Sequence, residues 1–334
     1  MQKREGKVSK EREWEVVSLG QFMDNPPELP DAILEPDLLY PGGKMEIYGV
    51  AKGGKSFLAQ QLAMCIASGT DWVGYRVPRS CKTLYLQGEV SKVGLYKRLT
   101  KASQGYDQAR VRAFLCTAPD RVIGEREDVE SLGRIIVENG IEVIVIDPLY
   151  HFLTGSESSG EDTGHFLRLL SYLQTVTGAA IVIIHHSRKS LTFDGKVMDA
   201  GFGEAKGSTN LVQWPDTVVR LHKVSKDVRE LRWEGVRHGI EPPDKTLIFN
   251  GENCRFEVLT NNPAEVIINQ LGEGPLNAKD LKALVMSETG LSLRQVERIL
   301  NRAVEQGQVE MVREKGDKRK VVYKLVSWKG EQDE

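Results

Sequence analysis

The chain has 334 residues, of which 40% are hydrophobic and 28% are charged, and its formal net charge at pH 7 is −2. This composition is that of an ordinary globular protein, and it disfavours a disordered chain, a collagen-like repeat and a disulfide-stapled scaffold. The near-neutral balance excludes a protein coated in basic charge, so any contact with nucleic acid has to be local. Because single cores rarely exceed roughly 250–300 residues, we expect one large domain and a smaller second one.

The cysteines are scattered, without the short CxxC spacing that metal ligation or redox chemistry requires. They are Cys65, Cys81, Cys116 and Cys254, and we expect inert thiols in a reducing compartment. The N-terminus is charged, and no run approaches the roughly 20 apolar residues of a membrane span. The sequence therefore predicts a soluble, cytoplasmic protein without membrane contact.

Residues 1–35 are polar and then interrupted by prolines, which predicts a flexible lead-in rather than part of a core. Between about residues 40 and 224, short apolar runs alternate with helical patterns, as in βαβ units on a mainly parallel sheet. The runs 143–146 and 180–184 are apolar on consecutive residues, as expected of strands covered on both faces. The expected strands are 45–50, 83–90, 111–116, 141–147 and 179–187, and the expected helices are 56–69, 93–103, 129–140 and 163–178.

Three further β-type segments with charged alternation, 217–224, 230–237 and 245–250, predict an antiparallel extension at the sheet edge. The chain then breaks at 261–263, where two asparagines precede a proline. Three helical patterns and two strands follow, an order typical of a winged helix-turn-helix. We therefore expect an α/β domain over residues 36–260, a winged-helix domain over 263–328 and an acidic tail over 329–334.

A glycine-rich segment follows the first expected strand and opens the first helix of the large domain. It reads Gly49, Val50, Ala51, Lys52, Gly53, Gly54, Lys55 and Ser56, followed by Phe57, and it fits the pattern GxxxxGK[ST]. Glycines here let backbone N–H groups turn toward the phosphates of a nucleotide at a helix N-terminus. Lys55 adds charge at the β- and γ-phosphates, and Ser56 offers its hydroxyl to Mg²⁺. The segment predicts an ATP site; the alternative is a glycine-rich turn that matches by chance.

Polar residues at other strand ends could complete this site. Asp147 is placed to order Mg²⁺, but it is followed by proline rather than glutamate, so the carboxylate that polarises water must come from elsewhere. Glu89 ends another strand at the carboxyl edge, where such sheets bind ligands. Of His185 and His186, only one is expected to face the nucleotide, because adjacent strand residues point to opposite sides. The alternatives are a solvated glutamate, a plain strand-end aspartate and a structural histidine.

Taken together, these motifs resemble those of the RecA-type ATPases in the hexameric replicative-helicase group, and most of all the RepA helicases of plasmids and mobile elements. The resemblance covers roughly residues 36–224 and includes the segment KGSTNLVQWPDTVVRL after the histidines. It implies a RecA-like fold and a ring, commonly of six subunits, with ATP between neighbours and single-stranded DNA in the central channel. It also implies nucleotide roles for Lys55, Ser56, Glu89, Asp147 and His186.

The same family supplies a basic residue across the subunit interface to the transition-state phosphates. Here Asp216 stands where the family has an arginine. This departure leaves Arg220 on the following strand as the predicted residue, with Lys223 and Lys206 as alternatives. The alternative is that the side chains of all three residues are merely exposed to solvent.

Two regions carry basic residues that could hold nucleic acid. The loop 187–205 contains Arg188, Lys189 and Lys196 together with two phenylalanines, a combination that suits phosphate contacts plus stacking, or else a mobile lid. The connection 151–164 is acidic and serine-rich, and we expect it to face solvent. In the C-terminal domain, Arg294, Arg298 and Arg302 share one face of the third helix, and Lys318 and Arg319 lie in the wing. A protein–protein module with a solvated charged face is the alternative.

The sequence thus predicts an ATP-hydrolysing motor on DNA that uses Mg²⁺ and assembles as a homo-oligomer. Glu89 would orient the attacking water, and His186 would report whether the γ-phosphate is present. A non-translocating ATP-dependent regulator or loader on DNA is the second hypothesis. A nucleotide kinase is the third, and it is disfavoured because no second-substrate lid with paired arginines follows the core.

Overall fold

The computed structural model describes residues 16–27, 30–118, 120–186, 192–193, 196–197, 209–259, 261, 263–291, 293–313 and 321–326. The chain divides into two units, residues 1–31 and residues 32–334. The first unit carries helix α1 (Leu19–Asp24), which begins with a capping box formed by Ser18 and Gln21 and buries none of its residues.

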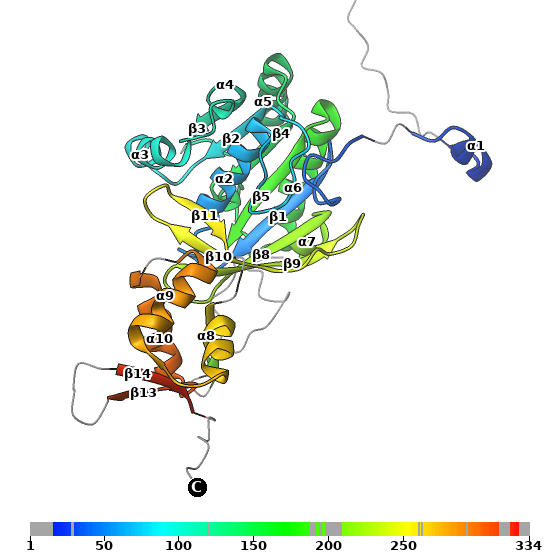
Figure 1. The fold of residues 1–334 in the computed structure, drawn as a ribbon. Coiled ribbons are helices and arrows are strands. Elements are labelled where there is room, and N and C mark those ends of the chain that lie inside the picture. Colours follow the sequence, from blue (N-terminus) through cyan, green and yellow to red (C-terminus); the bar gives the residue numbers. More distant parts are fainter. Residues whose placement is uncertain are drawn as a thin grey trace, which may run out of the picture. The chain divides into compact units, whose positions relative to one another are not determined.

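In the described part of the second unit, nine strands form one sheet in the order β11-β10-β9-β8-β1-β5-β4-β2-β3 (Figure 1). The strands are β1 (Lys44–Gly49), β2 (Thr83–Gln87), β3 (Ala113–Thr117), β4 (Val143–Asp147), β5 (Ala180–His186), β8 (Thr217–Lys223), β9 (Val228–Val236), β10 (Lys245–Asn250) and β11 (Arg255–Val258). From β3 to β8 all neighbouring strands are parallel, so their carboxyl ends meet at one edge. The five parallel strands expected from the sequence are confirmed.

Helices cover both faces of the parallel strands, as the unbroken apolar runs predict. On one face, α2 (Lys55–Ser68) packs into a hydrophobic cluster that includes Val143 and Val145 of β4. On the other face, α5 (Arg126–Asn139) and α6 (Gly160–Thr177) pack into a second cluster that includes Ile144 and Ile146. Successive residues of β4 thus serve opposite cores. The other helices of this region are α3 (Lys92–Ala102), α4 (Ala109–Arg112), the 3-10 turn η1 (Leu149–His151) and α7 (Thr209–Gln213).

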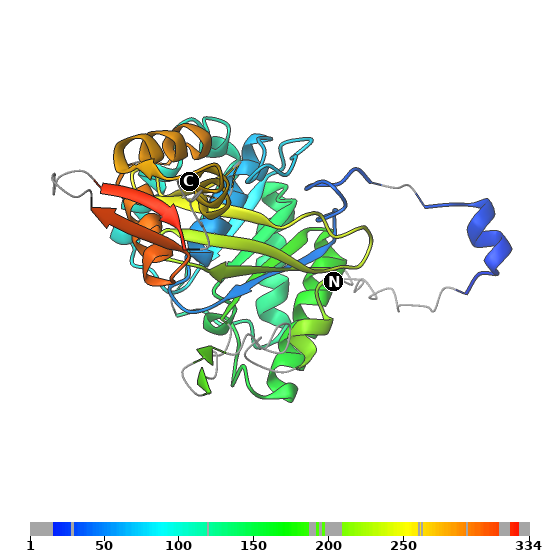
Figure 2. The ribbon, with the colours of Figure 1, turned by 60° about the horizontal axis from the view of Figure 1, so that its bottom comes forward.

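The structure corrects the expected antiparallel extension at its first strand. β8 lies parallel to β1, with Thr217 opposite Met45, and only β9, β10 and β11 continue antiparallel (Figure 2). Periodicity cannot distinguish these cases, because the direction of a strand depends on how its connection crosses the sheet. The last strand of the extension, β11, contacts α2. The side-chain amide of Gln61 forms two hydrogen bonds, of 2.9 and 2.8 Å, with the backbone of Phe256.

The structure also corrects the expected C-terminal end of the flexible lead-in. Ile33, Leu34, Leu38 and Leu39 are at most 2% exposed and belong to the same hydrophobic cluster as α2. The prolines shape this segment into a bridged turn, Leu34 pairing with Leu39, so it packs without being a helix or a strand of the sheet. The expectation of a flexible segment reaching residue 35 was therefore wrong for residues 33–35.

The C-terminal region has its own hydrophobic cluster. Its elements are α8 (Pro263–Gly272), β12 (Leu276–Asn277), α9 (Ala278–Thr289), α10 (Leu293–Glu305), β13 (Val309–Arg313) and β14 (Val321–Leu325). The expected three helices and two strands are present, and β12 adds a third strand in the order β12-β14-β13. Ile248 of β10 and Leu259, directly after β11, join this cluster. Among the described helices none is long and apolar enough to cross a lipid bilayer.

Candidate nucleotide-binding site

The glycine-rich segment forms the turn between β1 and α2. Gly49 (φ 153°) and Gly54 (φ 105°) adopt backbone conformations that are strained for residues with a Cβ. A Cβ at Gly49 would lie 2.5 Å from the carbonyl oxygen of Leu221, and one at Gly54 would lie 2.8 Å from the ring of Phe256. The close packing of β8 and β11 therefore requires these glycines, in addition to the shape of the turn.

We expect Gly49→Ala to lower the free energy of unfolding by about 1–3 kcal/mol, because the new methyl group meets rigid backbone at a strained φ. Urea unfolding followed by circular dichroism measures the change. Gly251→Ala is the control, since the structure describes no atom within 4 Å of a Cβ there. Equal unfolding midpoints for the two variants would contradict the packing described at Gly49.

Lys55 is 3% exposed and its ammonium group is surrounded by hydrogen-bond acceptors. It donates to the carbonyl oxygens of Gly49 and Val50 at 2.8 and 2.9 Å, and it lies 2.9 Å from Nδ1 of His186. Burial lowers the pKa of Lys55 to about 8, although nearby carboxylates, of which Asp147 acts most strongly, favour the charged form. A bound phosphate chain would give this buried cation an anionic partner.

This lowered pKa predicts a pH dependence of nucleotide binding. Below pH 8 Lys55 is already charged, so the Kd for MgATP should stay nearly constant between pH 7 and pH 7.5. Above pH 8 binding must take up a proton, and the Kd should rise by up to about tenfold per pH unit. Lys55→Arg keeps its charge and should flatten the profile. A wild-type Kd that does not change between pH 7 and pH 9.5, measured by fluorescence titration, would contradict the lowered pKa.

Ser56 and Asp147 lie together at the start of α2 and the end of β4. The Ser56 hydroxyl donates to Oδ1 of Asp147 at 3.1 Å, and the Tyr85 hydroxyl donates to Oδ2. Asp147 is 3% exposed, and burial raises the pKa of its carboxyl. A hydroxyl and a carboxylate are hard oxygen ligands, which Mg²⁺ takes together with water and phosphate oxygens. No cluster of three His, Cys, Asp or Glu side chains among the described residues could hold a metal alone, so this donor set fits a phosphate-bound Mg²⁺.

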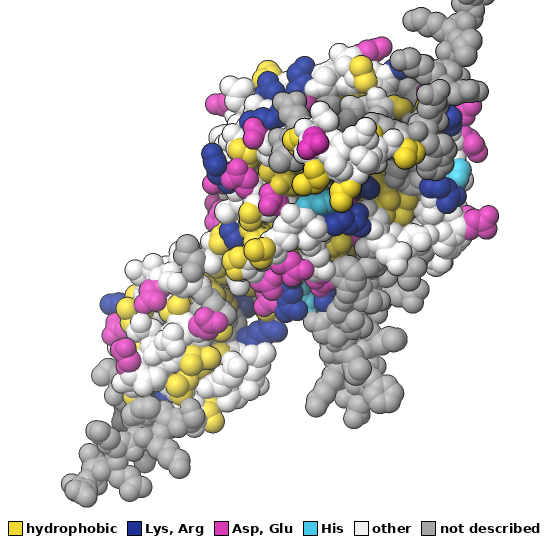
Figure 3. All heavy atoms as spheres, turned by 90° about the vertical axis from the view of Figure 1, so that its right-hand side faces the viewer, with side chains coloured by type: hydrophobic (Ala, Val, Ile, Leu, Met, Phe, Trp, Pro, Cys, Tyr) yellow, Lys and Arg dark blue, Asp and Glu magenta, His cyan; other side chains and the backbone are white. Residues whose placement is uncertain are grey.

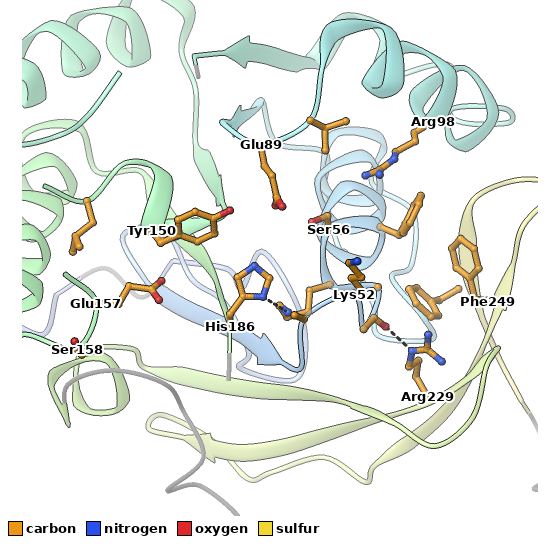
Figure 4. A pocket seen from close by; sticks show the side chains of 18 of the residues that line it. Lys52, Ser56, Glu89, Arg98, Tyr150, Glu157, Ser158, His186, Arg229 and Phe249 are labelled. Atoms are coloured by element: carbon orange, nitrogen blue, oxygen red, sulfur yellow. Dashed lines mark hydrogen bonds between the residues drawn. The ribbon is translucent and has the colours of Figure 1, made fainter. Parts of the chain in front are cut away.

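Lys55 and Ser56 line a cavity of about 1290 Å³ at the carboxyl ends of the strands, and Asp147 is hydrogen-bonded to Ser56 behind its wall (Figure 4). Glu89 is exposed and its carboxylate points into the cavity from the segment after β2. Tyr150 and Glu157 line the cavity on the same side. The acidic connection expected to face solvent thus contributes residues 155–158 to the cavity wall, a role that its composition did not indicate.

An aromatic surface lines the opposite side of the cavity (Figure 4). The ring centroids of Phe57 and Phe249 are 4.8 Å apart, and those of Phe249 and Phe256 are 5.2 Å apart. The guanidinium of Arg98 lies 4.7 Å from the centroid of Phe57. Aromatic rings and a guanidinium plane together form a surface on which a flat, delocalised ring can stack.

The two histidines at the end of β5 face opposite sides of the sheet, as the alternation of strand residues predicts. His186 lines the cavity beside Lys55. His185 is fully buried, with its Nδ1 2.7 Å from Oε1 of the equally buried Glu46. His186 is therefore placed to meet a nucleotide, whereas His185 is held inside the fold.

Arg220, the basic residue expected at a subunit interface, lies on β8 (Thr217–Lys223). Arg220 is 5% exposed, and its guanidinium lies 3.7 Å from Glu234 within the same chain. It therefore has a partner within the chain, and a role at a subunit interface stays a prediction. The alternative Lys223 is exposed at the end of β8, and Lys206 lies outside the described residues.

Asp216, which stands where the resembling family has an arginine, has a structural role. Its carboxylate accepts the backbone N–H of Lys44 at 3.0 Å and pairs with Arg237 at 2.7 Å. It therefore fixes the start of β8 beside the start of β1.

The predicted nucleic-acid residues have different positions. Arg188, Lys189, Lys318 and Arg319 lie outside the described residues, and Lys196 lies in the short strand β7 (Lys196–Val197), which pairs with β6 (Thr192–Phe193). Arg294 is exposed on α10. Arg298 pairs with Asp227, and Arg302 donates to the carbonyl oxygen of Val224 at 2.5 Å. Basic and acidic side chains are interspersed on the face shown in Figure 3.

Several residues of the site were missed from the sequence. Tyr85, Tyr150, Arg229 and Phe249 lie far from the glycine-rich segment in the chain, and only the fold brings them to it. Tyr85 alone had a usable signal, because its hydroxyl lies between the apolar Leu84 and Leu86 in a strand that ends near Glu89. A hydroxyl in a buried strand needs a hydrogen-bond partner, and a neighbouring strand-end carboxylate can supply one.

The turn, its lysine and the acids at the neighbouring strand ends define a P-loop ATPase with an α/β core. A family model described as an AAA domain, AAA_25, matches residues 9–191, which is more than half of the chain. The chain therefore belongs to this AAA domain family. A P-loop ATPase of this kind typically uses ATP with Mg²⁺.

No curated protein matches this chain. Among solved structures, the crystal structure of the RadB recombinase is similar to it with a TM-score of 0.44 and 20% sequence identity. That match covers 65% of this chain and 90% of the RadB chain.

Proposed function

We propose that this cavity binds MgATP and that the chain hydrolyses it. The observation that carries the proposal is that three separate elements bring their side chains to the P-loop, where Ser56 and Glu89 line one cavity and Asp147 contacts Ser56. Lys55 and Ser56 come from the P-loop helix, Asp147 from the end of β4, and Glu89 from the segment after β2. Phosphoryl transfer to water requires a cation at the phosphates, oxygen ligands for Mg²⁺ and a carboxylate that orients the water.

Nucleotide binding would use both sides of the cavity. The ammonium of Lys55 would exchange the carbonyl oxygens of Gly49 and Val50 for phosphate oxygens, a stronger charge-assisted contact. The nucleobase would stack on the surface formed by Phe57, Phe249 and Arg98. This arrangement orients the triphosphate from the aromatic side toward Glu89.

Hydrolysis would proceed by in-line attack of water on the γ-phosphate. Glu89 would accept a hydrogen bond from that water and orient it. Mg²⁺ held at Ser56 and Asp147 would neutralise charge on the phosphate oxygens. His186, at 2.9 Å from Lys55, would respond when Lys55 moves to the γ-phosphate, and it would thereby report nucleotide state to the segment after β5.

We further propose that hydrolysis drives movement on DNA, as in a RepA-like ring helicase of a plasmid, phage or mobile element. Support comes from the sequence resemblance over residues 36–224 and from the winged-helix order of the C-terminal elements. In this proposal the chain is a homo-oligomer, commonly a hexamer, with single-stranded DNA in its channel. Arg294 remains available on α10 for a phosphate contact.

One observation favours the alternative of a non-translocating regulator or loader. Arg298 and Arg302, two of the three arginines on one face of α10, contact Asp227 and Val224 of the ATPase region. Because these two arginines are engaged within the chain, less of the basic face of α10 is available to contact a DNA groove.

Strand displacement measured at a matched ATPase rate separates the two functions. Unwinding of a forked duplex that is lost in Lys55→Ala supports the motor. ATP-dependent DNA binding without unwinding supports the regulator. Absence of ATP hydrolysis, with or without single-stranded DNA, would contradict both.

A further inference from the structure

Arg229 is an arginine of β9 that is buried beside the P-loop, with 6% of its surface exposed. Its Nε donates to the carbonyl oxygen of Gly53 at 2.5 Å, and it also lines the nucleotide cavity (Figure 4). Gly53 belongs to the part of the loop whose backbone N–H groups face a bound phosphate chain. The side chain of Arg229 thus holds the backbone of the P-loop, although Arg229 is not part of that loop.

The other end of the same guanidinium holds the turn between β8 and β9. Its terminal nitrogen donates to the carbonyl oxygens of Ser225, Lys226 and Val228, at 2.8, 3.3 and 2.9 Å. Burial lowers the pKa of Arg229, and the nearby Asp227 favours the charged form. A buried cation is costly unless its donors have acceptors, and here carbonyl oxygens on two separate segments accept from Nε and from one terminal nitrogen.

This contact fixes which way one P-loop N–H points. In a trans peptide the C=O and the following N–H point in opposite directions. Because the carbonyl of Gly53 is held by Arg229, the N–H of Gly54 points away from Arg229. Oriented N–H groups of this loop form the anion cradle, so losing the contact with Arg229 would leave that peptide free to rotate.

The β8–β9 turn, to which Arg229 is hydrogen-bonded, also contacts the C-terminal region. Arg298 of α10 pairs with Asp227, and Arg302 donates to the carbonyl oxygen of Val224 at 2.5 Å. A chain of direct contacts therefore runs from α10 through the β8–β9 turn and Arg229 to Gly53. Hydrogen bonds and an ion pair form its two ends, and the backbone of residues 224–228 joins them.

We propose that Arg229 is a positioning residue for the phosphate cradle, and that docking of α10 on the β8–β9 turn helps to hold Arg229 in place. The proposal rests on MgATP binding at the P-loop, as proposed above. Arg229 touches the loop backbone rather than the reacting atoms, so its effect is on how well the cradle fits phosphate. The C-terminal region thereby influences nucleotide affinity from outside the cavity.

The test compares full-length variants by their Kd for MgADP and MgATP and by their thermal midpoint. Arg229→Met keeps the length but removes the donors, and we expect both Kd values to rise about tenfold. Arg229→Lys can reach one of the two segments but cannot bridge them, so it should show a partial rescue. Arg232→Met is the matched control on the same strand, because the guanidinium of Arg232 pairs with Glu230 away from the loop.

Arg298→Ala tests the remote part of the chain of contacts. We expect a smaller rise in both Kd values, of about two- to fourfold, with no change at the cavity itself. If Arg229→Met fails to fold, Arg229→Lys and Arg298→Ala decide. Unchanged Kd values in a folded Arg229 variant would overturn the positioning role, and an unchanged Kd in Arg298→Ala would overturn the docking part. A wild-type chain that binds no MgATP would instead refute the proposed function.

Discussion

Replacing Glu89 by glutamine is expected to lower the rate of ATP hydrolysis by about 10²–10⁴-fold, which is the usual contribution of a positioned general base. Binding of MgATP should stay within a few-fold of wild type, since Glu89 faces the cavity but makes none of the contacts that hold Lys55. The neutral amide keeps the shape of the side chain while losing its ability to draw a proton from water. Phosphate release and nucleotide binding, measured on the same preparation, separate the two effects.

Glu157 provides the matched control, because it is a second acid that lines the same cavity and acts on Lys55. Glu157→Gln should reduce hydrolysis far less than Glu89→Gln does. A larger loss in Glu157→Gln would transfer the role of orienting water to the 155–158 segment. Equal small losses in both variants would contradict a carboxylate-activated water.

Lys55→Ala is expected to weaken MgATP binding by at least about a hundredfold, because it removes a desolvated charge from the phosphate chain. Hydrolysis should become undetectable at ordinary nucleotide concentrations. The thermal midpoint should change little, because the removed ammonium group is itself poorly solvated, as its pKa of about 8 indicates. Calorimetric titration and a thermal melt of the same variant measure both quantities.

The thermal midpoint of Lys55→Ala distinguishes a role of Lys55 in nucleotide binding from a purely structural role. A large drop in thermal midpoint would mean that Lys55 is a structural cation serving the carbonyls of Gly49 and Val50. Nearly unchanged MgATP affinity in a stable Lys55→Ala variant would contradict the assignment of the loop as a phosphate cradle.

The local features of this protein could be read from its sequence. The P-loop is a contiguous pattern, and the positive φ angles of Gly49 and Gly54 belong to its turn. The parallel strands were evident because strands buried on both faces are apolar on every residue. The placement of Glu89 and Asp147 near the P-loop followed from one rule, that parallel strands present their carboxyl ends at one edge.

Features that depend on long-range packing could not be read in this way. The direction of β8 depends on a connection that crosses the sheet, and the contacts of Arg229 depend on β9 lying against the loop. Spacing by four placed Arg294, Arg298 and Arg302 on one helical face, but it could not tell whether that face meets DNA or Asp227. The burial of Ile33 and Leu34 was hidden because prolines around them indicated an extended lead-in.

The most direct test of the account is the release of inorganic phosphate from MgATP by the purified full-length chain. We expect hydrolysis that requires Mg²⁺ and that is lost in Lys55→Ala and in Glu89→Gln, with nucleotide binding lost only in the first. Wild-type protein that is folded but neither binds nor hydrolyses MgATP would contradict the central claim that these strand ends and this glycine-rich turn form one ATPase site.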